Sequence, residues 1–180
     1  MGEPQLKNSF IYNPFITAIS RRKMSAPLDF LLKNNHFENI KTVLDFGAGR
    51  MMDVLELNKI GVKCRAYDKY ADYYSPSDEL LLQNEYDLIM SNYVFNTIQT
   101  KKDHYKTLKI FRKIKSKRKI ISIRNDFNAI KKEWIYNESN ECFFTGKSFQ
   151  RFFNIKTLNR WFGNHVILEK KSNYLILELL

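Results

Sequence analysis

Cysteine, proline and glycine are all scarce in this sequence, with 2 Cys, 4 Pro and 6 Gly among 180 residues. Two cysteines, Cys64 and Cys142, are too few for a disulfide framework or a zinc cluster, so we expect both to be reduced and Cys64 to be a small buried side chain. The hydrophobic fraction of 44% and the aromatic fraction of 14% exclude a collagen-like, low-complexity or disordered chain. This composition predicts one folded domain with a substantial core.

Long apolar runs are also missing. Residues 174–177 form one of the longest, far shorter than the roughly 18 residues of a membrane-spanning helix. Residues 1–4 do not begin a secretory signal, and Leu6 stands where an N-myristoylation pattern needs Ser or Thr. We therefore expect a cytoplasmic protein with no membrane partner.

Positive charge is abundant and concentrated in one stretch. The chain has a net charge of +11, and residues 101–124 carry eleven basic residues against the single acid Asp103. The helical spacing places four lysines on one face and four hydrophobic residues on another: Lys102, Lys106, Lys109 and Lys113, against Tyr105, Leu108, Phe111 and Ile114. The pattern predicts an amphipathic helix, whose basic face is either an electrostatic contact for DNA or RNA or an ordinary solvated surface.

Strand and helix patterns alternate along most of the chain. Residues 13–14 and 25–27 have the cap-and-proline pattern of helix starts, and the second helix is expected through Leu32. Strands are expected at residues 42–46, 62–67, 86–90 and 119–124, with a helix at about 51–59 and another from Asn154 to near Gly163. Residues 165–170 and 174–179 predict a closing β-hairpin. The fold class is therefore α/β, a Rossmann-like three-layer αβα sandwich with a mostly parallel sheet and a C-terminal antiparallel hairpin.

Ligands of such sheets bind beyond the carboxyl ends of the strands. Two glycines, Gly47 and Gly49, follow the first strand, whose last polar residue is Asp45. Asp68, 19 residues after Gly49, ends the next strand, where it can accept both hydroxyl groups of a ribose. Met52 occupies the place of a third glycine, so the pattern favours a nucleoside ligand with a cationic amino-acid end over a dinucleotide.

These residues resemble a known family. The sequence Val-Leu-Asp-Phe-Gly-Ala-Gly at 43–49, together with Asp68, is similar to the first two motifs of class I S-adenosylmethionine-dependent methyltransferases, and the resemblance extends over about residues 41–180. A narrower resemblance links four segments to methyltransferases associated with bacterial DNA phosphorothioation and related defence or phage loci: 20–28, 67–70, 92–98 and 145–153.

The resemblance implies S-adenosylmethionine as cofactor and a set of binding residues. Gly47 and Gly49 would lie under its methionine and ribose portions, Asp68 would hold the ribose, and Asp45 would orient the amino group directly or through water. The full set of expected cofactor contacts is Asp45, Phe46, Gly47, Ala48, Gly49, Asp68, Lys69, Ser91 and Asn92. Arg50 departs from the glycine that many family members have there, and the stretch between Tyr70 and Tyr86 leaves little room for their third strand and helix.

The residues that would catalyse methyl transfer are harder to identify, because a sulfonium methyl group needs no covalent catalyst. Residues 91–96 occupy the place of the amino-group DNA methyltransferase motif but lack its two prolines, and neither cysteine fits a cytosine-type nucleophile. Asn92 and Tyr93 could orient a substrate and stack on a base, or could cap the next helix and pack on the sheet. His104 is expected on a helix surface and His165 at a strand start, and no metal site is expected.

Other cations could contact a substrate. The candidates for substrate or nucleic-acid contact are Arg21, Arg22, Lys23, Lys102, Lys106, Lys109, Lys113, Arg124 and Arg151. The basic segment 115–119 is expected as a loop on the side of the sheet away from the cofactor.

The sequence thus predicts two parts, an N-terminal helical lid or cap at residues 1–40 and a methyltransferase-like domain at 41–180. The expected function is methyl transfer to nucleic acid or a nucleotide-like substrate. One alternative is a non-catalytic module with this fold in a defence or counter-defence system, where a protein partner could complete the site. Another is methylation of a small molecule or a protein, for which a narrow, lidded cleft would be expected.

Overall fold

A computed structural model describes residues 14–180, and within them a six-stranded main sheet has the order β2-β1-β3-β4-β9-β8. Its strands are β1 (Thr42–Phe46), β2 (Lys63–Tyr67), β3 (Glu85–Asn92), β4 (Lys115–Arg124), β8 (His165–Lys170) and β9 (Tyr174–Leu179). Strands β1 to β4 pair in parallel, and β9 is antiparallel to both β4 and β8. The predicted fold class and the closing hairpin are confirmed.

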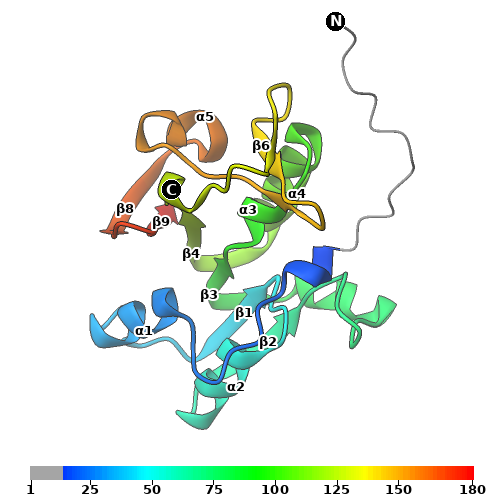
Figure 1. Cartoon of the computed structure of the whole chain (residues 1–180). Coiled ribbons are helices and arrows are strands. Elements are labelled where there is room, and N and C mark those ends of the chain that lie inside the picture. Colours follow the sequence, from blue (N-terminus) through cyan, green and yellow to red (C-terminus); the bar gives the residue numbers. More distant parts are fainter. Residues whose placement is uncertain (1–13) are drawn as a thin grey trace, which may run out of the picture.

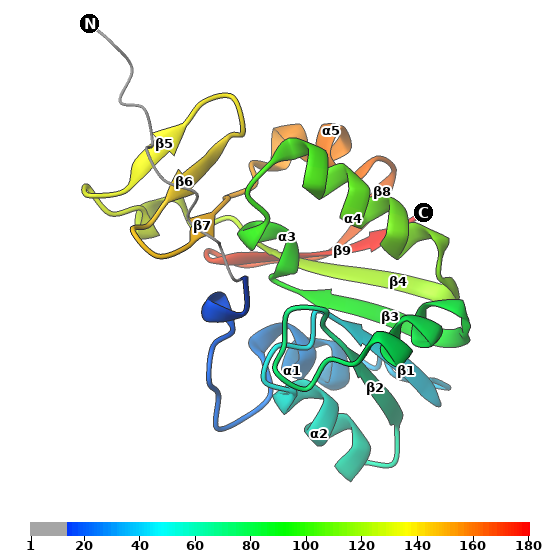
Figure 2. The same ribbon diagram turned by 90° about the vertical axis from the view of Figure 1, so that its right-hand side faces the viewer.

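Helices cover both faces of the main sheet (Figures 1 and 2). One face carries α1 (Ala26–Lys33) and α2 (Met52–Lys59), and the other carries α4 (Lys101–Lys113) and α5 (Leu158–Phe162), with the single-turn α3 (Val94–Thr97) before α4. Alternate residues of β1 and β3 belong to two separate hydrophobic cores. Val43, Leu88 and Met90 pack towards α1 and α2, whereas Leu44 and Ile89 pack towards α4 and α5. The three-layer arrangement follows from this alternation.

Helix α1 starts where the sequence predicts. Ser25 is its N-cap, and the Ser25 hydroxyl accepts a hydrogen bond from the Leu28 backbone N–H at 3.3 Å. The other predicted cap, Asn13, lies outside the described residues, which begin with the short 3-10 helix η1 (Pro14–Thr17). In the described part of the chain no helix combines the length and apolar character that a membrane crossing needs.

The link between β2 and β3 contains η2 (Pro76–Gln83), a 3-10 helix, and no strand, so β2 is an edge of the sheet. The Tyr67 hydroxyl donates to Glu79 Oε1 at 2.8 Å and fixes η2 against the end of β2. The short link therefore has no third strand, as its length implied.

Helix α4 exposes its four lysines as predicted, but its buried face differs by one position. His104 is completely buried among aromatic rings, whereas Tyr105 is 43% exposed. The prediction used a constant step of three, and the helical repeat of 3.6 residues brings His104 in line with Leu108 and Phe111 instead. The surface assignment of His104 was wrong.

Strand β4 begins earlier than predicted, so the expected basic loop at 115–119 is wrong. Its cations pair with acids on the neighbouring strands: Lys117 with Asp87 at 2.7 Å and Arg118 with Glu178 at 2.8 Å. These ion pairs balance two of the positive charges of β4, so the basic segment can pair with its neighbouring strands. The segment still lies at the amino ends of the parallel strands, away from the carboxyl ends.

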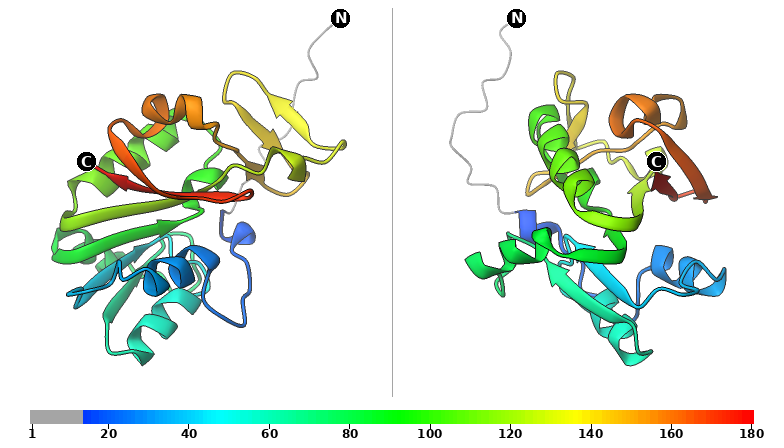
Figure 3. Two further views of the ribbon diagram at one scale, coloured as in Figure 1. Left: turned by 90° about the vertical axis from the view of Figure 1, so that its left-hand side faces the viewer. Right: turned by 180° about the vertical axis from the view of Figure 1, so that it is seen from behind.

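A second, three-stranded sheet was not predicted. It consists of β5 (Ile135–Asn137), β6 (Cys142–Phe144) and β7 (Phe149–Gln150), and it extends beyond the carboxyl end of β4 (Figures 2 and 3). Short 3-10 turns flank it on both sides, η3 (Phe127–Ala129) before it and η4 (Ile155–Thr157) after it. Contacts between aromatic rings, including the tilted Tyr136–Phe143 pair with centroids 4.9 Å apart, support the sheet in place of a broad core.

Candidate functional site

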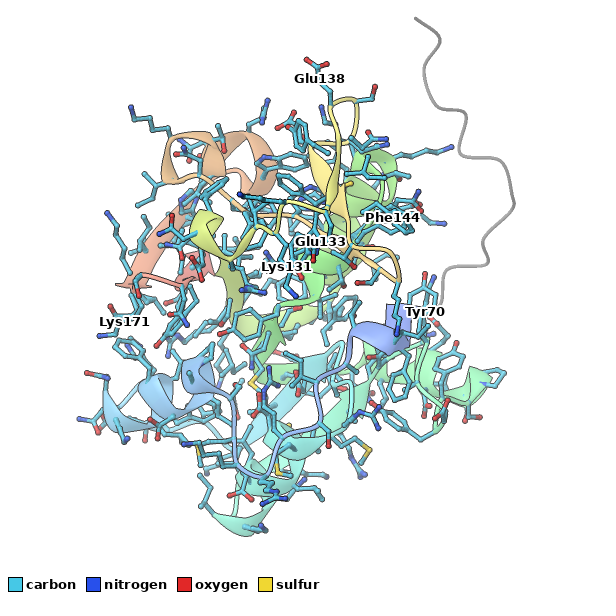
Figure 4. The ribbon with its side chains drawn as sticks, viewed as in Figure 1. Tyr70, Lys131, Glu133, Glu138, Phe144 and Lys171 are labelled. Carbon is cyan, nitrogen blue, oxygen red and sulfur yellow. The ribbon has the colours of Figure 1, made fainter. Side chains whose placement is uncertain are left out.

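A pocket of about 610 Å³ lies at the carboxyl ends of the parallel strands. Residues 46–50 after β1, 67–70 at the end of β2 and 92–94 at the end of β3 form one side of it. The N-terminal segment contributes Phe15, Thr17, Ala18, Ile19 and Arg21. Figure 3 shows this segment at the same end of the main sheet as the small sheet, and in Figure 4 the Tyr70 side chain lies beside η1. Residues 15–21, called the lid segment or lid below, thus form part of the pocket wall.

The loop at residues 47–50, called the glycine loop below, has glycine at two positions where the backbone is left-handed and a neighbouring side chain is close. Gly47 has a φ of +83°, and a Cβ there would lie 2.1 Å from Val94 Cγ2 on α3. Gly49 has a φ of +53° and faces the Ala18 methyl group, which a Cβ would approach to 3.2 Å. At Gly47 the contact with Val94 excludes a side chain, whereas at Gly49 a side chain would strain the left-handed backbone and crowd Ala18. The loop is therefore shaped by packing as well as by any ligand.

Asp68 connects β2 to this loop. Its Oδ2 accepts a hydrogen bond from the Gly49 backbone N–H at 3.0 Å, and its Oδ1 accepts one from the Tyr70 N–H at 3.1 Å. Burial raises the pKa of Asp68, and the two backbone hydrogen bonds oppose that rise. Each carboxylate oxygen keeps a second lone pair, so Asp68 can still accept from ligand hydroxyl groups in the pocket.

Asp45 lies under the loop and does not line the pocket. It is 3% exposed, and its Oδ1 has no hydrogen-bond partner. Burial raises its pKa well above the usual value, the nearby carboxylates of Asp53 and Asp68 raise it further, and the Arg21 guanidinium lowers it. The expected contact between Asp45 and a cofactor is therefore not direct in this conformation.

Asp53 was not predicted as a functional residue, although it organises the floor of the pocket. It is 5% exposed and binds two other elements: its Oδ1 accepts from the Ser25 N–H at 2.6 Å, and its Oδ2 accepts from the Ser25 hydroxyl at 2.6 Å and from Asn92 Nδ2 at 2.9 Å. The start of α1, the first turn of α2 and the end of β3 are thereby joined. The only sequence signal was an acid beside Met52, where dinucleotide-binding proteins have glycine.

Asn92 and Tyr93 both line the pocket, as expected, but Ser91 does not. Ser91 is fully buried because successive strand residues face opposite sides of the sheet, so its assignment as a cofactor contact is corrected. Tyr93 has a φ of +65°, which is uncommon for a residue with a side chain. Burial raises the pKa of Tyr93 to about 12, so its hydroxyl is neutral at physiological pH.

The basic candidates separate into three groups. The pocket walls include Arg21, Lys69, Lys106 and Arg124. Exposed side chains outside these walls belong to Arg22, Lys23, Lys102, Lys109 and Lys113. Arg151 is 1% exposed and donates from Nη2 to the backbone oxygens of Gln99 and Asn140, at 3.2 and 2.9 Å. Its assignment as a substrate contact is therefore corrected to a structural one.

Arg50, at a position where many class I methyltransferases have glycine, contacts the N-terminal segment. Its Nε donates to the Ala18 backbone oxygen at 3.1 Å, and its guanidinium lies 5.5 Å from the centre of the Phe15 ring. Other pocket walls that the sequence did not indicate come from α3, α4 and the loop between them: Val94, Thr97, Ile98, Gln99, Asp103, Thr107 and Ile110.

Thiol and metal chemistry find no support in residues 14–180. Cys64 and Cys142 are both buried, and burial raises the pKa of each thiol, which disfavours the reactive thiolate. No group of three or more His, Cys, Asp or Glu side chains in these residues could hold a metal ion.

Comparison with protein-family models gave no match, and comparison with curated proteins gave none either. Among solved structures, the 1,6-didemethyltoxoflavin-N1-methyltransferase of Burkholderia thailandensis, bound to 1,6-didemethyltoxoflavin and S-adenosylhomocysteine, aligns with a TM-score of 0.58 and 16% identity over 85% of this chain and 76% of its own.

Two further structures are similar. The complex of DhpI with S-adenosylhomocysteine (SAH) has a TM-score of 0.51 and 9% identity, over 85% of this chain and 82% of that one. A methyltransferase of Bacteroides fragilis in complex with SAH has a TM-score of 0.50 and 15% identity, over 89% and 78%. The protein therefore has the fold of S-adenosylmethionine-dependent methyltransferases.

Proposed function

We propose that this protein is an S-adenosylmethionine-dependent methyltransferase whose cofactor lies along the glycine loop and Asp68. The observation that carries the proposal is the joint position of these two features: Gly49 and Asp68 are hydrogen-bonded to each other and line the same pocket. The similar structures of the methyltransferases from Burkholderia thailandensis and Bacteroides fragilis contain SAH, which supports this cofactor.

The residues present fit such a cofactor. The pocket volume of about 610 Å³ lies within the usual range for small-ligand sites. Asp68 would accept from the ribose hydroxyl groups, Gly47 and Gly49 would allow close approach of the backbone, and Asp45 would balance a cationic amino group through an intervening water. When bound, S-adenosylmethionine supplies an electrophilic methyl group, and the task of the protein is to hold the acceptor in line with it.

The acceptor that we propose is a nucleic acid or a nucleotide-like molecule. The motif resemblance to methyltransferases associated with DNA phosphorothioation favours DNA. Lys106 belongs both to the basic face of α4 and to the pocket wall, so the basic face reaches the site. The segment at residues 15–21 narrows the pocket and favours an acceptor of nucleotide size, or a single flipped base, over an intact duplex. The same feature also fits the alternative of small-molecule methylation.

One observation favours the alternative of a non-catalytic module. The amide of Asn92, a candidate catalytic group, donates to Asp53 and Ser25, and its Oδ1 is covered by protein. The group is thus engaged in holding the pocket floor, as it would be in a protein that keeps the fold for binding a partner. Partner chains that complete the site belong to this alternative.

Methyl transfer from labelled S-adenosylmethionine to DNA, RNA and mononucleotides tests the proposal. Asp68→Ala should abolish transfer and weaken SAH binding by about 100-fold, because two hydrogen bonds to a charged acceptor are lost. Asp72→Ala is the matched control, since Asp72 is an exposed acid nearby that does not line the pocket. Unchanged transfer by Asp68→Ala would refute the site, whereas SAH binding without any transfer would favour the non-catalytic module.

A further inference from the structure

Two arginines approach Tyr93 from different parts of the chain. The guanidinium carbon of Arg21, in the lid, lies 5.8 Å from the centre of the Tyr93 ring. Arg124, the last residue of β4, lies two positions after Ser122, whose carbonyl oxygen accepts a hydrogen bond from the Tyr93 N–H at 2.8 Å. The charges of both arginines favour the ionised form of the Tyr93 hydroxyl. All three residues line the same pocket as the glycine loop. Their charges therefore act on one region of its wall.

Neither arginine has an acidic partner within residues 14–180, where the ion pairs involve other cations. Arg118 and Arg160, in contrast, each pair with a glutamate. The charge of Arg21 lowers the pKa of Asp45, but burial has the larger effect and disfavours the ionised form of this acid. The two guanidinium groups are thus unpaired among the described residues, although the charge of Asp53 also acts on Tyr93 and opposes theirs.

Arg124 is held in place by its backbone while its side-chain donors remain available. The Arg124 N–H donates to Asn96 Oδ1, and its carbonyl oxygen accepts from the Phe153 N–H, both at 3.0 Å. The guanidinium lies over the Phe152 ring at 5.2 Å, a contact that leaves the N–H edges of the fork free. Asn96 is fully buried, so this anchor is rigid.

The surroundings add neutral polar groups to this cationic region. Gln150, from β7 of the small sheet, and Asn173, from the hairpin turn between β8 and β9, belong to the same pocket. Figure 4 shows the neighbouring Lys171 on that turn, and Lys131 and Glu133 on the segment that leads into the small sheet. The region therefore combines the guanidinium groups of the two arginines, the side-chain amides of Gln150 and Asn173, and the ring of Tyr93.

We propose that Arg21 and Arg124 together bind a phosphate or carboxylate group of the methyl acceptor, with a planar part of the acceptor against Tyr93. Two unpaired cations facing one site raise its potential, and an anion between them relieves their repulsion. The planar fork of arginine matches the oxygens of phosphate and carboxylate groups. This inference rests on the proposed function, because the acceptor must lie in the pocket that holds the methyl donor.

The same chemistry has a second source, since the amino-acid end of the cofactor also carries a carboxylate. The experiment therefore uses the full chain saturated with SAH, which already fills the cofactor's own anion site. Cytidine 5′-monophosphate and inorganic phosphate are titrated in by calorimetry, with cytidine as the uncharged comparison. We expect the monophosphate to bind at least about tenfold more tightly than cytidine.

Variants assign the binding to the two arginines. Arg124→Gln and Arg21→Gln should each weaken monophosphate binding to the SAH complex by about fivefold or more, because each removes one charged guanidinium group. The SAH affinity of each variant is measured in the same titrations, so that every comparison is made at saturation with SAH. Arg124→Lys retains the charge, so its affinity for the monophosphate should fall less than that of Arg124→Gln. Arg22→Gln is the matched control, since Arg22 is an exposed neighbour of Arg21 outside the pocket wall.

The possible outcomes separate the two proposals. The anion site is overturned if the SAH complex does not bind the monophosphate, or if the wild type and both glutamine variants bind it equally well. In either case, SAH binding by the wild type still supports the cofactor site. A loss of SAH affinity in Arg21→Gln without an effect of Arg124→Gln on the monophosphate assigns Arg21 to the cofactor and also overturns the anion site. If the wild type fails to bind SAH, the proposed function is contradicted, and arginine-dependent monophosphate binding alone would still support the anion site.

Discussion

Asp45 lies beneath the glycine loop with its carboxyl group buried and one oxygen without a hydrogen-bond partner. Burial, with Asp53 and Asp68 nearby, raises its pKa well above the ordinary value of 3.8. The fold thus favours the neutral acid. Its contribution to stability is fully present below the ordinary pKa and is lost as the pH rises through the raised pKa of the folded state.

Asp45→Asn should therefore stabilise the cofactor-free protein near neutral pH, because asparagine has the shape of the acid without a charge to bury. The melting temperature of the variant should exceed that of the wild type at about pH 8, and the difference should narrow towards about pH 4. SAH affinity should fall, since a bound cationic amino group favours the ionised form of Asp45, which asparagine cannot adopt. Thermal melts over this pH range check the prediction, and a variant that is less stable at the high end would contradict it.

Helix α4 is the element whose surface charge carries a functional prediction. Its four exposed lysines, Lys102, Lys106, Lys109 and Lys113, form the basic face. Changing all four to glutamate should weaken retention on single-stranded DNA or RNA and flatten the salt dependence of binding, because fewer phosphates are neutralised. The matched control changes four exposed lysines on or beside α1 and α2: Lys33, Lys41, Lys59 and Lys63. Equal retention of the wild type and both variants would reject nucleic-acid binding by α4.

Elements with a strong local pattern could be predicted from the sequence, and those held by distant contacts could not. The alternating runs of β8 and β9 and the apolar run of β1 lie where they were expected. The strands of the small sheet have three residues or fewer, too short for a periodic pattern, and Phe143 of β6 contacts the rings of Trp134 and Phe152, which flank the sheet in sequence. The start of β4 looked like a loop because its ion-pair partners lie on other strands.

At the scale of the whole molecule, some residues of the candidate site could be predicted from local sequence, and others depend on contacts with distant segments. Gly47, Gly49 and Asp68 could be recognised because glycines and an acid at strand ends are local signals. The roles of Arg50 and Asp53 could not, because they depend on contacts with Ala18 and Ser25, which lie 32 and 28 positions away in sequence, respectively. The assembled pocket joins β1, β2, β3, α4, the small sheet and the lid, an arrangement that local patterns do not encode.

The central claim is that this assembled pocket binds S-adenosylmethionine. Calorimetric titration of the purified protein with SAH tests it most directly, without any knowledge of the acceptor. We predict saturable binding at one site per chain, with a Kd on the order of micromolar. A folded protein that binds neither SAH nor S-adenosylmethionine would contradict the account.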